Sequence, residues 1–104
     1  MSGFANPVRG EAAILIAGRT HVLRPSFAAL VAAEGELGSL FAILERASEG
    51  RLRLEELAAL FWHCLADRET VPREAVGEAI LAQGLAASSR PLKMLLHQIL
   101  QGAA

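Results

Sequence analysis

The chain has 104 residues, with ten basic and eleven acidic side chains and a formal charge of −1, which is the size of one small domain. The basic residues form no block or stripe, so the sequence disfavours nucleic-acid binding, which needs clustered cations to neutralise phosphates. A single Cys excludes an internal disulfide, and no apolar run approaches the roughly 18 residues of a membrane span. Residues 1–9 read as a flexible lead-in without the features of a signal peptide, which predicts a cytoplasmic protein with one globular domain over residues 10–104.

A β-hairpin is predicted over residues 11–24. The apolar triplet Ile14, Leu15 and Ile16 favours a strand, and Gly18 can take the positive φ that a two-residue hairpin turn needs. A two-stranded hairpin is marginal in water by itself. One face must therefore pack on the rest of the chain, and its free edge is open to strand addition.

The remainder of the chain predicts helices, because apolar residues recur at spacings of three and four. Ser26 is a good N-cap for the first helix, in which Phe27, Leu30 and Val31 recur at helical spacing. Helices are predicted over about 27–35, 40–48, 53–66, 72–83 and 90–101. The predicted fold class is α+β and helix-dominated, with an N-terminal β-hairpin followed by a bundle of four to five short amphipathic helices.

The stretch LFWHCL, at residues 60–65, holds the only Trp and the only Cys of the chain. A helical wheel places Cys64 with Leu54 on the face predicted to meet the core, and it places His63 on the solvent side. Because Cys64 and His63 diverge by about 100°, they cannot form a nucleophile and base pair. Trp62 lies at the boundary, where it either covers the edge of the core or anchors a partner.

No group of residues has the pattern of a catalytic, metal or cofactor site. The three His are far apart in the sequence, and no two have metal-ligand spacing. Glu55 and Glu56 open the third predicted helix, where carboxylates favour the positive end of the helix dipole. The sequence also lacks a glycine-rich phosphate loop. We therefore expect a protein that is not an enzyme, with no cofactor, metal or small-molecule substrate.

The order of segments along the chain is more specific than any local motif. A Gly-Glu pair opens the hairpin and a Gly-Arg pair closes its turn. An L-x-x-S-F-x-A-L segment and a Glu-x-x-x-Gly helix end follow, then a G-x-L stretch and a closing helix. The residues in this pattern are Gly10, Glu11, Gly18, Arg19, Leu23, Ser26, Phe27, Ala29, Leu30, Glu34, Gly38, Gly50, Leu52, Val76, Ile80 and Gly84.

With this pattern the chain resembles, over about residues 9–101, the small tail proteins of gene transfer agents and related prophages of alphaproteobacteria. The family is variously called gene-transfer-agent family protein, phage tail tube protein or tail assembly chaperone. Arg53 departs from the pattern, since the cap of the third helix often carries an acidic or hydroxyl residue there.

The resemblance implies a tail morphogenesis protein, and a tail assembly chaperone that binds the tape measure protein is the favoured interpretation. The implied partners are a tape measure or tail tube protein, with self-association through the hairpin edge as a further possibility. Two alternatives are a structural tail component of the particle and a small helix-turn-helix-like regulator. The residues predicted to contact a partner are Ile14, Leu15, Ile16 and Trp62, for which ordinary core packing is the alternative.

Overall fold

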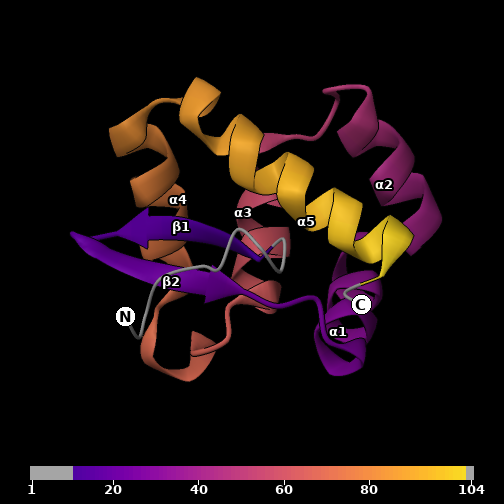
Figure 1. The fold of residues 1–104 in the computed structure, drawn as a ribbon, viewed down its shortest axis with the longest axis horizontal. Helices are drawn as coiled ribbons and strands as arrows, with labels where there is room; N and C mark the ends of the chain where they lie inside the picture. The colour runs from indigo at the N-terminus through magenta and orange to yellow at the C-terminus, as the bar shows by residue number, and fades with distance from the viewer. Residues whose placement is uncertain (1–10, 103–104) are drawn as a thin grey trace.

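The computed structural model describes residues 11–102, in which a β-hairpin packs against five α-helices (Figure 1). The predicted helix-dominated α+β class is confirmed. The segment predicted to be a flexible lead-in, residues 1–9, lies outside the described residues. The elements are β1 (Ala12–Ile16), β2 (Arg19–Leu23), α1 (Phe27–Leu37), α2 (Leu40–Ser48), α3 (Leu54–Cys64), η2 (Arg68–Thr70), α4 (Arg73–Gln83), η3 (Leu85–Ser88) and α5 (Ser89–Gln101).

The hairpin has the register that a two-residue turn at residues 17 and 18 dictates. The strands are antiparallel, and Ile14 pairs with His21. Ala17 and Gly18 both have positive φ, at 51° and 81°, as a type I′ turn requires. The tight turn therefore places Ala17 in a left-handed conformation, which is energetically unfavourable for a residue that has a side chain.

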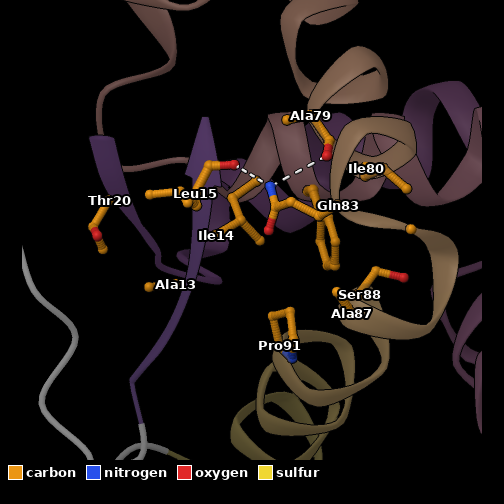
Figure 2. Close-up of a pocket in the computed structure, with 12 residues that line it drawn as sticks. Ala13, Ile14, Leu15, Thr20, Ala79, Ile80, Gln83, Ala87, Ser88 and Pro91 are labelled. Atoms are coloured by element: carbon orange, nitrogen blue, oxygen red, sulfur yellow. Dashed lines mark hydrogen bonds between the residues drawn. The ribbon is translucent and has the colours of Figure 1, made fainter. Parts of the chain in front are cut away.

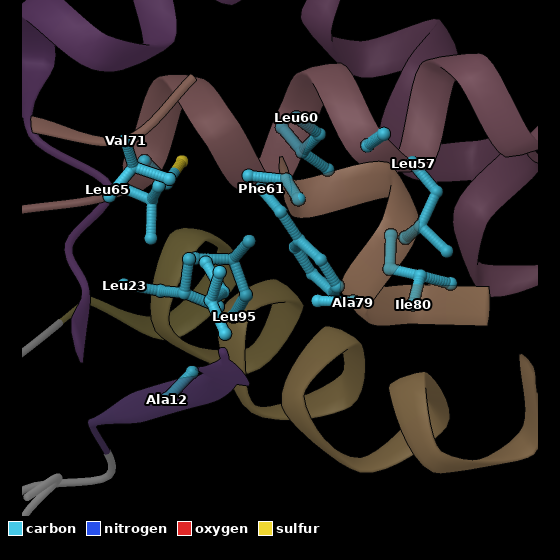
Figure 3. Packing of buried hydrophobic residues seen from close by; sticks show 14 of the residues in the cluster. Ala12, Leu23, Leu57, Leu60, Phe61, Leu65, Val71, Ala79, Ile80 and Leu95 are labelled. Atoms are coloured by element: carbon cyan, nitrogen blue, oxygen red, sulfur yellow. The ribbon is translucent and has the colours of Figure 1, made fainter. Parts of the chain in front are cut away.

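The inner face of the hairpin is set by small and apolar side chains. Ala12 and Ile16 are 0% and 4% exposed and join the main core, and Leu23 on β2 is fully buried with them. Leu15 points to the other side and is 44% exposed. The helices α4 and α5 contact β1, so the core lies between the hairpin and the helices (Figure 3).

The first helix begins where the sequence predicts and ends later. The Oγ of Ser26 accepts a hydrogen bond from the Ala29 amide at 3.1 Å, which satisfies one of the free donors of the first turn. Gly35 lies inside the helix, which continues to Leu37 and stops at Gly38, where φ is 96°. A glycine inside a helix costs only about 1 kcal/mol, whereas the positive φ at Gly38 cannot continue one.

The buried side chains of α1 are small. Ala29 and Ala33 are 4% and 0% exposed, and they let α1 approach α3 closely. Phe27 and Val31, which recur at helical spacing, are instead 86% and 51% exposed. The face of α1 that meets the core is therefore formed by alanines. The helical spacing of the large apolar residues does not identify this face.

The central helix is α3, which packs between α1 and α4 and is covered on almost every side. Figure 3 shows Leu57, Leu60 and Phe61 pointing into the core with residues of β2, α4 and α5. Two wheel-based predictions are wrong. His63, predicted to be solvated, is only 7% exposed because α1 covers that side of α3, and Leu54, placed on the core face, is 43% exposed at the first turn.

After α3 the chain runs extended along β2. Leu65 forms an isolated antiparallel bridge with Leu23. The Ala66 amide donates to the Val22 carbonyl at 3.0 Å, and the Arg24 amide donates to the carbonyl at position 64 at 2.6 Å. The outer edge of β2 is thereby paired by the chain itself.

Candidate interaction site

The second edge of the hairpin is the outer edge of β1, on the side away from β2. Ile16 and Arg19 flank the two-residue turn and form a hydrogen-bonded pair, and such pairs alternate along an antiparallel ladder. Ala13 and Leu15 therefore direct their backbone N–H and C=O groups away from β2. In the described part of the chain, the Leu15 carbonyl accepts one hydrogen bond there, from Gln83 Nε2 at 2.5 Å (Figure 2).

A groove with a volume of about 280 Å³ lies beside this edge, between β1 and the segment that joins α4 to α5 (Figure 2). Its described lining is uncharged and mostly apolar, and many of its members are small. The lining residues are Ala13, Ile14, Leu15, Thr20, Phe61, Ala79, Ile80, Gln83, Gly84, Ala87, Ser88 and Pro91. The α4 and η3 side of this groove was not predicted from the sequence. The Gln83-Gly84 pair at the end of α4 is the one local sequence signal for this side of the groove.

The three hairpin residues predicted to contact a partner do not form one surface. Leu15 is exposed and lines the groove, and Ile14 is half-buried at its wall. Ile16 is 4% exposed and belongs to the main core. The structure therefore leaves the side chains of Ile14 and Leu15 accessible at the groove, and it gives Ile16 a packing role.

Trp62 lies at the boundary of the core, half-buried, and makes internal contacts on several sides. Its indole Nε1 donates to the Val71 carbonyl at 2.8 Å. The guanidinium carbons of Arg73 and Arg68 lie 4.7 Å and 5.8 Å from the ring centroid, distances at which a cation is attracted to the ring. These contacts fix the indole, and its predicted role as a partner anchor stays a prediction.

His63 and Glu36 tie α3 to the end of α1. His63 Nε2 lies 2.8 Å from Glu36 Oε1, and Arg73 Nη1 lies 2.5 Å from Glu36 Oε2. Hydrogen bonds from Arg73 and then from His63 lower the pKa of the Glu36 carboxyl, because they favour its charged form. The arrangement is a structural clamp that joins α1, α3 and α4.

Cys64 is fully buried, as predicted, and burial raises the pKa of its thiol to about 12. The thiol is therefore protonated at neutral pH and is a poor nucleophile. Across residues 11–102, no three His, Cys, Asp or Glu side chains gather in a way that would hold a metal ion. In the same range no single helix is long and apolar enough to span a membrane, and α1 and α2 satisfy that test only as a pair bent by 85°.

Large apolar side chains are exposed on several helices as well as at the groove. Phe27 and Phe41 are 86% and 82% exposed, and Leu81 and Leu85 are each 59% exposed. Leu81 and Leu85 flank the Gln83-Gly84 pair that lines the groove. Each of these side chains is available for contact with another protein.

The described residues form a helix-dominated α+β domain with several large apolar side chains exposed, and such side chains are available for contact with other proteins. Comparison with known families gives a specific assignment, because residues 9–102 match the family model described as "Phage tail tube protein, GTA-gp10". The chain belongs to this family of phage and gene-transfer-agent tail proteins. No curated protein and no solved structure matches the chain.

Proposed function

We propose that the protein is a tail assembly chaperone that binds the tape measure protein in the cytoplasm of the bacterial host, and that it is not an enzyme. The observation that carries the proposal is the amount of unpartnered apolar surface on a small fold. Phe27 and Phe41 lie almost fully exposed on α1 and α2, although either side chain would stabilise the protein by about 1.5–3 kcal/mol if it were buried.

A chaperone uses such a surface to cover apolar segments of a client until the client assembles. Many copies bound along one long chain gain avidity, so each contact can remain weak and reversible. The formal charge of −1 adds little electrostatic repulsion between neighbouring copies.

Co-expression with a tape measure protein of a phage or gene-transfer-agent tail tests the proposal. We expect a tagged copy of this protein to keep the tape measure protein soluble and to co-purify with it at a fixed ratio of several copies per client. A tape measure protein that stays insoluble and unbound would contradict the chaperone function. Expression of the client alone is the control for its intrinsic solubility.

The family description favours a second candidate, a structural component of the tail. The matched family is described as a tail tube protein, and exposed apolar surfaces together with an open strand edge also suit self-assembly. Mass spectrometry of purified particles separates the two candidates. A structural component is present there in many copies, whereas a chaperone is absent.

A further inference from the structure

We propose that the groove beside β1 accepts an extended, uncharged segment of the client protein, which adds a strand to the edge of β1 that no other strand of the described residues pairs. The inference rests on the proposed function for the identity of the client. It adds the mode of recognition, which is backbone pairing at the hairpin edge with apolar side chains held in the groove.

The two edges of the hairpin differ in how the described residues pair with them. The edge of β2 is covered by residues 64–66, whose backbone exchanges hydrogen bonds with Val22 and Arg24. This chain thus already shows how an extended segment adds to its sheet. The edge of β1 has the same alternating donors and acceptors, at Ala13 and Leu15, and among the described residues only the Gln83 side chain occupies one of them.

The chemistry of the groove favours an uncharged occupant. None of its described lining residues carries a charge, so a charged segment would lose hydration there without gaining a partner. Leu15 and Ala87 contribute exposed apolar surface to the lining, and about 280 Å³ is enough for one or two apolar side chains. Gly84 and Ala87 line the wall of the groove across from β1, and small residues there let another backbone come close.

The Gln83 side chain occupies a backbone acceptor that an added strand would use. Its amide makes the hydrogen bond to Leu15 that the amide of an added strand would make, and it also contacts the Ala79 carbonyl at 3.2 Å. Gln83 is exposed, so it can swing away without disturbing the core. We assign it the role of a placeholder that the incoming backbone displaces.

Amide hydrogen exchange on the free protein and on its complex with the tape measure protein tests the inference. We expect the amides of Ala13 and Leu15 to exchange at least tenfold more slowly in the complex. The amides of Ile14 and Ile16, which pair with β2, are the internal control and should be protected in both states. A complex that leaves Ala13 and Leu15 unprotected would overturn this inference and leave the chaperone function standing.

Failure to form any complex would overturn the chaperone function and this inference with it. Protection of Ala13 and Leu15 that rises with protein concentration in the absence of the client would identify a second copy of this chain as the occupant. That result would also overturn the assignment to a client segment.

Two pairs of variants separate backbone pairing from side-chain contact. Leu15→Pro removes the outward N–H, which no strand of the hairpin uses, whereas Leu15→Ala shortens the side chain and keeps the N–H. We expect Leu15→Pro to bind the client roughly three- to tenfold more weakly than Leu15→Ala, which is the effect of one lost hydrogen bond. Equal binding by the two variants would overturn the backbone pairing.

The second pair does not depend on how the strand tolerates proline. Gln83→Ala frees the Leu15 carbonyl and should bind the client at least as tightly as the unmodified protein. Gln83→Glu places a carboxylate beside that carbonyl in an uncharged groove and should weaken binding by roughly tenfold. Indistinguishable binding by Gln83→Ala and Gln83→Glu would contradict a role for this edge.

Discussion

Phenylalanine side chains are buried at the centre of α3 and exposed on the outer faces of α1 and α2. In α3, Phe61 is fully buried and contacts the rest of the core, and even His63 is covered. On α1 and α2, Phe27 and Phe41 remain more than four-fifths exposed. The buried core is therefore centred on α3, whereas Phe27 and Phe41 on the outer faces of α1 and α2 are accessible to other proteins.

The largest expected effect is on the α3 side of the comparison. Phe61→Ala removes a fully buried ring and should lower the free energy of unfolding by about 3–5 kcal/mol, because it combines lost burial with a cavity. Urea unfolding followed by circular dichroism measures the loss. Leu54→Ala is the control in the same helix, and because Leu54 is 43% exposed it should cost less than about 1 kcal/mol. Equal losses would contradict the special position of the α3 centre.

How far the sequence predicts this fold depends on how many faces of a helix are covered. The stripe of α2, with Ile43, Leu44 and Ala47, is buried as its periodicity predicts, since α2 has one covered face. The helical wheel of α3 fails at His63, because α3 is packed between α1 and α4 and has no exposed residue from Leu57 to Cys64. The wheel of α1 fails at Phe27, because alanines rather than large residues form its contact face.

The candidate site was predictable only in part. A two-residue turn fixes the register and therefore which backbone groups of β1 face outward, and the exposed edge follows from the sequence. The groove beside that edge depends on where α4 ends relative to β1, and Gln83 and Leu15 lie 68 positions apart in the chain. No local pattern predicts a contact of that kind, because it arises from tertiary packing.

The next effect, in order of size, concerns the clamp that covers α3 from the side of α1. His63→Ala removes the hydrogen bond to Glu36 and leaves a small void, so it should lower the free energy of unfolding by about 1–3 kcal/mol. His63→Gln, which retains a side-chain donor, should recover part of this loss. Urea unfolding of both variants provides the measurement. An unchanged free energy of unfolding for His63→Ala would show that the packing of α1 does not depend on this contact.

A smaller effect is expected at the junction of α2 and α3. Arg46 donates two hydrogen bonds to Glu56, at 2.7 Å and 2.8 Å, and the Arg53 amide donates a third at 3.0 Å. These bonds lower the pKa of Glu56 from 4.5 to about 2. Because the folded-state pKa is depressed, the stabilisation is complete above about pH 4.5 and is lost as the pH falls towards 2.

Unfolding of Glu56→Gln across that range checks the sign. The variant should be less stable than the unmodified protein at pH 7, and the difference should shrink between pH 4.5 and pH 2. Glu55→Gln, at the exposed neighbouring position, is the matched control and should show a clearly smaller loss at pH 7, because its carboxylate interacts only with the helix dipole. A stability difference that is constant with pH would show that the carboxylate charge does not contribute.

The smallest effect on stability, and the most informative for function, is expected on the exposed side of the comparison. Phe27→Ser and Phe41→Ser alter side chains that are 86% and 82% exposed, so each should change the free energy of unfolding by no more than about 0.5 kcal/mol. If these rings contact the client, the double variant should nevertheless lose co-purification with the tape measure protein while its urea midpoint stays unchanged. Undiminished binding would restrict the client contact to the hairpin edge and its groove. A large loss of stability would instead show that these two rings stabilise the folded protein. The contrast between a buried α3 centre and exposed faces of α1 and α2 would then be wrong.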